Sequence, residues 1–301
     1  MKVRMAVAPS FTSFDPDEYT GFIESLEQLG FDTVWLSDIP LGASTDPIVA
    51  LAHAAARTTT LKLGTNIVPL GRNPMTLAKE LAQLDLLSNG RLLLSFVPGI
   101  DQPGERGALG IGKQHRGRLI DEIIGLVRAW WSGDAVTATF GPYVYDAIEV
   151  RPLPRQNPLE IWLGGMGPAA LDRAGRLGDG WLGAMLEPGA AGDARRVIER
   201  AANDAGRRID PEHFGLSLGY SRVEPSEQAL AMMKARRPDA DPRSLLPVGR
   251  EQLRDLLRAH IDEGLSKFVL RLTAGSLDQN MPTASRDELE WLADATLDLQ
   301  T

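Results

Sequence analysis

Short apolar runs alternate with amphipathic helical patterns along the chain, and this alternation limits the fold more than any other feature. Eight runs have the length and composition of buried strands, at residues 3–8, 33–37, 61–68, 92–97, 161–163, 180–184, 214–220 and 268–272. Helical patterns accompany them at residues 16–29, 47–58, 74–87, 117–131, 168–177, 189–205, 250–263 and 286–299. Eight strands alternating with eight helices predict an α/β fold, a parallel sheet closed into a (β/α)8 TIM barrel. An open doubly wound sheet is the alternative, and the strand count favours the barrel.

Two segments interrupt the alternation. Residues 135–150, AVTATFGPYVYDAIEV, alternate around a Gly-Pro turn, which predicts a β-hairpin inserted between the fourth helix and the fifth strand. Residues 224–247 are rich in Pro, Arg, Asp and Ser, with a short helical pattern at 227–235, and we interpret them as a mobile excursion over one face. The sequence contains no interdomain linker, so we expect residues 1–301 to form one domain with insertion segments.

The stretch IWLGGMGPAALDRAGRLGDGW, residues 161–181, predicts a strand that breaks into glycines and then enters a helix at Pro168. Glycines let a backbone approach an anion closely, and the free N–H groups of a helix start favour negative charge. A dinucleotide-binding fingerprint opens its domain and is followed by an acidic residue about 20 positions later, which this stretch does not match. A phosphate cradle at the carboxyl end of a barrel strand fits better, and a tight turn without a ligand remains the alternative.

The composition excludes several classes of partner and site. The 301 residues carry 32 basic and 40 acidic side chains, a formal net charge of −8, which disfavours nucleic acid and anionic membranes as partners. The chain has no cysteine, and its His and carboxylate residues are not clustered, so we expect no metal site. The N-terminal sequence is unlike a signal peptide and no apolar run is long enough to span a membrane. We expect a cytoplasmic protein that binds a small molecule.

Several stretches together resemble one known family. They are FDTVWLSD, LKLGTNIVPLGRNPMTLAKELAQLDLLSNGRLLLSFVPG, IWLGGMGPAAL and GRLGDGWL, and the most specific part is NPMTLAKELAQLDLLSNGR. They resemble the luciferase-like monooxygenase superfamily, and most closely its branch of oxidoreductases that depend on coenzyme F420, a deazaflavin. This resemblance implies a bacterial-luciferase-like barrel, a cofactor with a tricyclic ring and a phosphate tail, and hydride chemistry.

Working residues of a barrel lie at the carboxyl ends of its strands. The residues expected there to bind the cofactor are Asp38, Asn66, Ile67, Val68, Val97, Pro98, Gly99, Gly164, Gly165, Met166 and Gly167. The resemblance implies that Asp38 contacts the cofactor and that the Asn66–Ile67 peptide bond is cis, buttressing the ring. His115, with Arg116 at a helix start, is a candidate for binding an anion or substrate. The candidate catalytic residues are Asp38, Asp101 and His115.

The leading functional hypothesis is hydride transfer between C5 of coenzyme F420 and a small organic substrate, with the protein holding both and excluding water. One alternative is an FMN-dependent monooxygenase that uses reduced flavin and oxygen. Another is a protein that binds a flavin or deazaflavin without turnover.

Two positions depart from the sugar-phosphate dehydrogenases of the deazaflavin branch. Those enzymes have a histidine after the aspartate of the second strand and a glutamate after the glycine of the fourth, whereas this sequence has Ile39 and Ile100. Neither isoleucine can transfer a proton, so we expect no oxidation of sugar phosphates. The remaining acid–base candidates are Asp38, Asp101 and His115.

The helices expected at residues 47–58 and 74–87 carry alanine and leucine on more than one face, as in PIVALAHAAA. A barrel helix normally has one apolar stripe and one polar face. We therefore expect a homodimer that forms through these two helices.

Overall fold

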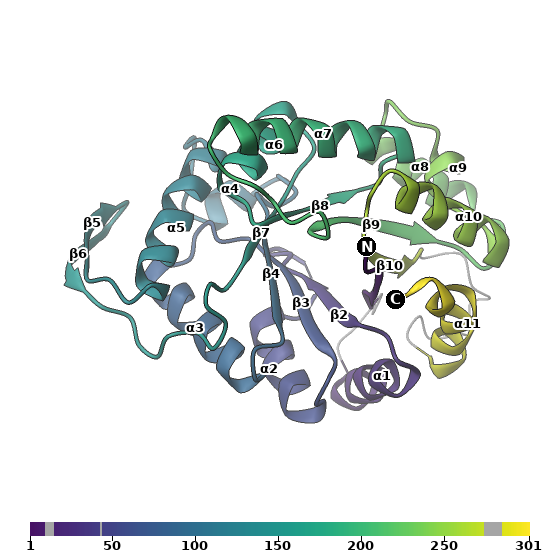
Figure 1. The fold of residues 1–301 in the computed structure, drawn as a ribbon, viewed down its shortest axis with the longest axis horizontal. Coiled ribbons are helices and arrows are strands. Elements are labelled where there is room, and N and C mark those ends of the chain that lie inside the picture. The colour runs from purple at the N-terminus through teal and green to yellow at the C-terminus, as the bar shows by residue number, and fades with distance from the viewer. Residues whose placement is uncertain (10–14, 43, 274–284) are drawn as a thin grey trace.

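Eight parallel strands close into a barrel in the order β1-β10-β9-β8-β7-β4-β3-β2 (Figure 1). The computed structural model describes residues 1–9, 15–42, 44–273 and 285–301. The barrel strands are β1 (Arg4–Val7), β2 (Thr33–Ser37), β3 (Lys62–Ile67), β4 (Leu92–Phe96), β7 (Ile161–Gly164), β8 (Gly180–Ala184), β9 (Phe214–Tyr220) and β10 (Lys267–Leu272). The structure confirms the predicted barrel, and each expected strand agrees with an observed one to within one residue at either end.

Helices surround the barrel, and most of those that follow a strand begin where the sequence supplies a cap. The helices are α1 (Pro16–Leu29), α2 (Pro47–Arg57), α3 (Pro74–Leu87), α4 (Glu105–Ala108), α5 (Arg116–Trp131), α6 (Pro168–Leu177), α7 (Pro188–Asp204), α8 (Glu227–Arg236), α9 (Pro242–Leu245), α10 (Gly249–Asp262) and α11 (Arg286–Thr296), with a 3₁₀ turn at Leu297–Leu299. Asp15, Asp46 and Asn73 accept hydrogen bonds from the first turns of α1, α2 and α3, each of which has proline in its first turn.

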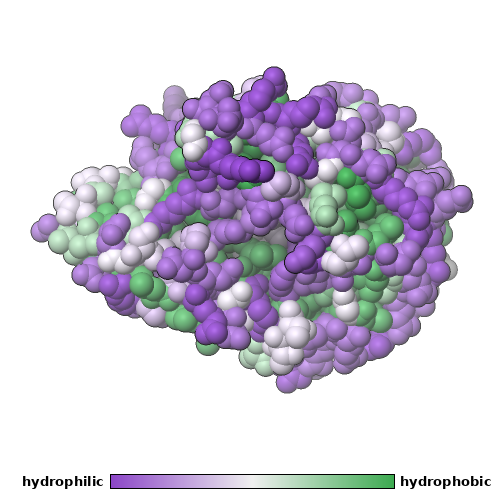
Figure 2. All heavy atoms as spheres, viewed as in Figure 1, coloured by the Kyte–Doolittle hydropathy of each residue, from purple (hydrophilic) through white to green (hydrophobic). Residues whose placement is uncertain are grey.

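Both predicted insertions have regular structure. The hairpin β5 (Val136–Phe140) and β6 (Tyr143–Ile148) forms as expected and projects from the barrel (Figure 1). It is joined to α5 through Trp130, whose Nε1 donates to the carbonyl of Ile148 and whose ring meets Tyr145 edge-on. In Figure 2 its surface is paler and more hydrophobic than much of the face shown, and its Val144 is exposed. The segment 224–247 contains the predicted helix as α8 and also the short helix α9.

Side chains fill the barrel interior. Trp35 and Trp162 lie there with Ala6, Leu182 and Val269. A Cβ added at Gly64 would overlap the Trp35 indole, so Gly64 leaves room for that ring. The face of β3 that carries Gly64 therefore points into the barrel. The interior is therefore a packed core, and ligands have access only at its ends.

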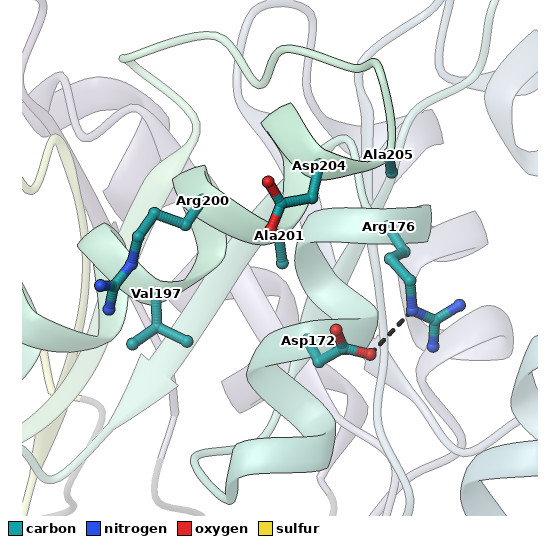
Figure 3. Close-up of a pocket in the computed structure, with 7 residues that line it drawn as sticks. All are labelled: Asp172, Arg176, Val197, Arg200, Ala201, Asp204 and Ala205. Atoms are coloured by element: carbon teal, nitrogen blue, oxygen red, sulfur yellow. Dashed lines mark hydrogen bonds and ion pairs between the residues drawn. The ribbon is translucent and has the colours of Figure 1, made fainter.

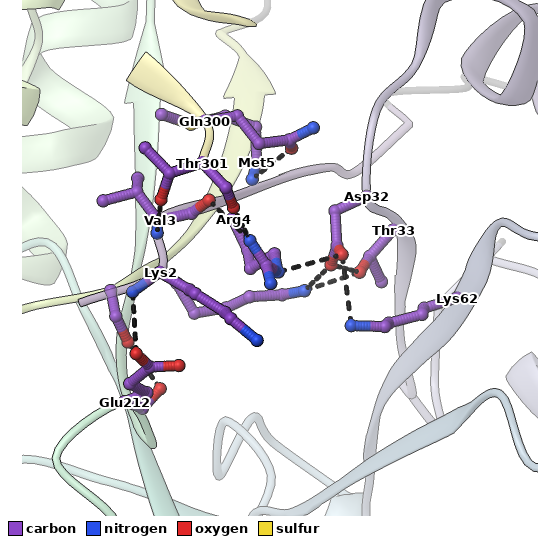
Figure 4. A network of polar contacts seen from close by, with 12 residues as sticks. Lys2, Val3, Arg4, Met5, Asp32, Thr33, Lys62, Glu212, Gln300 and Thr301 are labelled. Carbon is purple, nitrogen blue, oxygen red and sulfur yellow. Dashed lines mark hydrogen bonds and ion pairs between the residues drawn. The ribbon is translucent and has the colours of Figure 1, made fainter.

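The amino end of the barrel is closed by a polar network (Figure 4). Asp32 accepts from the buried ammonium of Lys267 and forms ion pairs with Lys62 at 3.2 Å and Arg4 at 3.4 Å. Burial disfavours the carboxylate of Asp32, but the lysines outweigh burial and hold its pKa well below the usual range. Burial also lowers the pKa of Lys267 to about 8. This end is occupied by protein charges, which leaves the carboxyl end as the place for a ligand.

Candidate functional site

A layer of polar side chains lies at the carboxyl end of the barrel interior. Ser37, Asn66 and Ser95 come from β2, β3 and β4, and the strand register pairs Ser37 with Asn66 and Asn66 with Ser95. Asn66 Nδ2 donates to Ser37 Oγ at 3.3 Å. Among the described residues, Asn66 Oδ1 and Ser95 Oγ are buried without a hydrogen-bond partner. Buried polar atoms are normally satisfied, so these two atoms fit a site whose ligand supplies hydrogen bonds.

The prediction of a cis Asn66–Ile67 peptide is wrong in this structure. The cis bonds among the described residues are Arg151–Pro152 and Asn157–Pro158. Strand β3 continues through Ile67 in parallel register, and the carbonyls of Asn66 and Ile67 accept from Asp38 N at 2.8 Å and Val97 N at 2.9 Å. Both carbonyls are thus used by the regular ladder, in the extended trans geometry that the ladder requires.

Asp38 lies at the end of β2, where its carboxylate is bound from two directions. Its Oδ2 accepts from the N–H of Val68 at 3.1 Å and from Arg72 Nη2 at 3.0 Å. Arg72 also reaches Asp46, at 3.0 Å. Burial raises the pKa of Asp38 above its ordinary value, although Arg72 and the Val68 N–H oppose this. These residues line a cavity of about 290 Å³ that also includes Ile39.

Asp101 follows β4 and is held by two guanidinium groups. Arg106 Nε lies 3.0 Å from its Oδ1, and Arg116 Nη2 lies 2.6 Å from the same atom. Arg116 is buried and also donates to the carbonyl of Pro98 at 3.0 Å. Asp101 is therefore one partner in an ion-pair cluster of this loop. The charge of Arg116 faces two protein carboxylates, Asp101 and Glu105, and its role toward a ligand anion stays a prediction.

The same cluster contains Glu105, which is not among the site residues predicted from the sequence. Glu105 is fully buried, lies 3.5 Å from Arg116 Nη2, and accepts from the N–H of Gln102 at 3.2 Å. A Cβ at Gly99, whose φ is +81°, would overlap its carboxylate. Nothing in the local sequence pattern distinguishes this glutamate from a solvated one, since only the fold of the loop buries it.

The glycine segment leaves backbone donors open beside the mouth. Gly164 ends β7, and a Cβ there would lie 2.7 Å from Val97 Cγ1. Gly165 has φ +110°, a conformation that favours glycine. Gly167 is the N-cap of α6, and α6 has no side-chain cap. The segment thus has the open donors and close packing of an anion cradle, as the sequence predicts.

A cavity of about 300 Å³ joins this segment to the start of α5. It is lined by Phe96, Pro98, His115, Gly164, Gly167 and Pro168, among others. His115 is the N-cap of α5, and its Nδ1 accepts from the N–H of Arg118 at 3.3 Å. The structure therefore places His115 beside the glycine segment.

Another cavity lies outside the barrel, away from the strand ends. It has a volume of about 370 Å³ and is formed by α6 and α7, with Asp172, Arg176, Arg200 and Asp204 among its lining (Figure 3). Asp172 and Arg176 are paired with each other at 2.7 Å. The cavity lies on the helical layer and shares no lining residue with the cavities at the mouth, so we do not assign the function to it.

The mouth has few groups that could transfer a proton. Ile39 is half-buried and Ile100 is 66% exposed, in the places that hold a histidine and a glutamate in the sugar-phosphate enzymes.

Within residues 1–9, 15–42, 44–273 and 285–301, no group of three or more His, Asp or Glu could hold a metal ion. The same residues include no helix that could span a membrane.

The chain is similar in sequence to proteins of known activity. The chain is 28% identical over 237 residues to an F420-dependent hydroxymycolic acid dehydrogenase of Mycobacterium tuberculosis, covering 75% of this chain and 64% of that protein. It is 28% identical over 240 residues to an FMNH(2)-dependent dimethylsulfone monooxygenase of Pseudomonas fluorescens, covering 77% and 62%. The chain thus spans less than two thirds of the length of these two relatives.

A solved structure and a family profile complete the comparison. The coenzyme F420-dependent tetrahydromethanopterin reductase of Methanopyrus kandleri superposes with a TM-score of 0.78 at 18% identity, over 100% of both chains, and this likeness shows the fold. The family described as luciferase-like monooxygenase matches residues 2–288. The chain therefore belongs to the luciferase-like monooxygenase family.

Proposed function

We propose that this protein is an oxidoreductase that transfers a hydride between C5 of coenzyme F420 and a small organic substrate. The observation that carries the proposal is the pair of unpartnered buried atoms, Asn66 Oδ1 and Ser95 Oγ, at the barrel mouth beside the open glycine segment. A flat ring with polar edges and a phosphate tail matches that combination of hydrogen-bonding side chains and backbone donors. The F420-dependent dehydrogenase among the relatives supports the choice of cofactor.

Each part of the site has a role under this proposal. When bound, the deazaflavin supplies the hydride donor or acceptor at C5. Asn66 and Ser95 orient the ring edge, and Val97, Pro98 and Gly99 flank it at the end of β4. The glycine segment holds the phosphate, while Asp38 borders the ring from β2. The chain's contribution is to align ring and substrate and to keep water away from them.

The small number of groups that could donate a proton at the mouth limits the substrate. Asp101 is ion-paired, and Ile39 and Ile100 cannot carry protons. A substrate that accepts a hydride without prior activation by a protein acid fits this mouth, for example an activated enone. Asp38, whose pKa is raised, is the remaining carboxyl near the ring.

A second reading is an FMN-dependent monooxygenase, favoured by the similarity to the dimethylsulfone enzyme. A third is a protein that binds the ring without turnover. Titration of the purified chain with coenzyme F420 and with FMN, each oxidised and reduced, distinguishes the first two. The proposal expects tight binding of the deazaflavin and its oxidation in the presence of an enone. Tight FMN binding with no response to the deazaflavin would overturn it, and binding without turnover would favour the third reading.

Two neighbouring variants test the observation on which the proposal depends. Asn66→Leu removes a polar group on the inward face of β3, whereas Thr65→Val removes the Oγ1 of Thr65, also buried and unpartnered, on the opposite face. The proposal expects weaker deazaflavin binding for Asn66→Leu, by about tenfold or more, and unchanged binding for Thr65→Val. Equal affinities in both variants would show that Asn66 does not face the ring.

A further inference from the structure

The indole of Trp181 holds one peptide group of the glycine segment. Its Nε1 donates to the carbonyl oxygen of Gly165 at 2.9 Å. Trp181 belongs to β8, is fully buried, and pairs in the sheet with Leu163 of the neighbouring strand. The bond therefore ties the loop after β7 to a rigid element of the barrel.

This bond sets the direction of a second group. In a trans peptide, the carbonyl of one residue and the N–H of the next point in opposite directions. The Gly165 carbonyl points toward the buried indole, so the N–H of Met166 points away from it, out of the core. No hydrogen bond uses the Met166 N–H within the part of the chain that the structure describes.

The space around the indole leaves it little freedom. A Cβ added at Gly183, two residues along the same face of β8, would overlap the ring of Trp181. The indole thus extends over Gly183 toward the carboxyl end of the strand, which is where Gly165 lies. Gly165 contributes the backbone conformation, with φ +110°. Trp181 and Gly183 on one strand and Gly165 in the loop therefore cooperate to aim one donor.

We propose that Trp181 is a positioning residue that orients the Met166 N–H toward the phosphate of a bound cofactor. The inference rests on the proposed function, because it needs a phosphate-bearing ligand at the mouth. Trp181 touches neither ring nor substrate and acts through the Gly165–Met166 peptide. Without the indole donor this peptide is free to rotate, and the donor loses its direction toward the anion.

The test compares Trp181→Phe with Trp130→Phe. Trp130 is a matched control, because it is also fully buried and its Nε1 also donates to a backbone carbonyl at 2.9 Å, that of Ile148, near the hairpin. The measured quantity is the phosphate preference, defined as the Kd of the phosphate-free ligand divided by the Kd of its phosphate-bearing counterpart. It is measured for two pairs of ligands, riboflavin with FMN and the phosphate-free deazaflavin with coenzyme F420. We expect Trp181→Phe to reduce this ratio about 10- to 100-fold, with Trp130→Phe unchanged. Simple loss of packing would weaken both ligands of a pair equally.

If Trp181→Phe does not fold, Gly183→Ala displaces the indole while keeping its donor, and we expect the same loss of phosphate preference. A phosphate preference near one in the wild type, or a preference that is unchanged in both variants, overturns the role of Trp181. The proposed function is not contradicted by either result if the ring still binds.

If neither a flavin nor the deazaflavin binds, the proposed function fails. The role of Trp181 is then decided with inorganic phosphate against chloride at equal ionic strength, measured by thermal unfolding. Stabilisation by phosphate in wild type and Trp130→Phe but not in Trp181→Phe supports it, and any other pattern overturns it.

Discussion

Arg72 donates to Asp38 across 3.0 Å and thereby connects the loop after β3 to the end of β2. The Asp38 side chain is only 7% exposed, so this guanidinium is the main compensation for a carboxylate that is otherwise poorly solvated. The pair forms one wall of the mouth, and the opposite charges of Arg72 and Asp38 together determine the charge that a ligand meets there.

Replacing Arg72 with Met is expected to lower the free energy of unfolding by about 1–3 kcal/mol, because it leaves a buried carboxylate without its cation. The pKa of Asp38, already raised, should rise further. A carboxyl with a raised folded pKa binds more protons folded than unfolded, so the loss of stability should be greater at pH 8 than at pH 5. Urea unfolding at the two pH values measures it.

Two further variants check the origin of the effect. Adding Asp38→Asn to the Arg72→Met background should remove the pH dependence. Arg118→Met breaks an exposed pair with Glu122 and should change stability by less than about 0.5 kcal/mol. Equal losses in Arg72→Met and Arg118→Met would contradict the importance of the buried pair.

Gly165→Ala should destabilise the fold and weaken cofactor binding. The new Cβ would lie 2.8 Å from the Cβ of Ala170, and φ +110° is unfavourable for any other residue, so a cost of about 1–3 kcal/mol is expected. Gly167→Ala is the control for folding, since its Cβ meets nothing within 4 Å at φ −72°. A Gly165→Ala protein with unchanged affinity for coenzyme F420 and FMN would refute the cradle.

His260 should make the fold sensitive to mild acid. Its ring is fully buried, both nitrogens are unpartnered among the described residues, and burial lowers its pKa to about 4. The unfolded chain then binds the proton more readily, so stability should fall as the pH drops from about 6.5 to 4, by up to about 3 kcal/mol. His260→Leu should remove this part of the pH dependence, as measured by unfolding at pH 7 and 5. An identical pH profile in the variant would show that His260 does not contribute.

Glucose 6-phosphate should not be oxidised with coenzyme F420 as acceptor. Ile39 and Ile100 replace the two proton-transferring groups of the sugar-phosphate enzymes, and such groups contribute about 10²–10⁴-fold each. The assay follows deazaflavin reduction, with an enone and reduced deazaflavin as the positive control. Robust sugar-phosphate oxidation would mean that another group carries the proton.

The homodimer remains a prediction, and the structure changes which residues are expected to form its interface. Most apolar residues of α2 and α3, including Leu51 and Leu81, are buried in the chain's own core. Val49, Leu86 and Leu87 remain exposed and are the expected contacts. Light scattering at micromolar concentration should give a dimeric mass, and the double variant Val49→Lys, Leu87→Glu should give a monomer. A monomeric wild type would refute the prediction.

Local patterns in the sequence were sufficient to predict the barrel. Strand and helix periodicity and the glycines after β7 each act over a few residues. The candidate positions at the strand ends follow from the same reasoning, because all parallel strands of a barrel end on one side. That is why Asp38, Asn66 and the glycine segment could be placed at one mouth without a structure.

Tertiary structure alone decided how those positions are used. The pairing of Asp101 with Arg116, the contact of Glu105 with Arg116, and the bond from Trp181 to Gly165 join residues that are 11 to 16 positions apart through the folding of loops. The trans geometry at Asn66–Ile67 was likewise set by the neighbouring strands. A charge or a peptide plane responds to whatever lies within a few ångströms, and only the folded chain determines those neighbours.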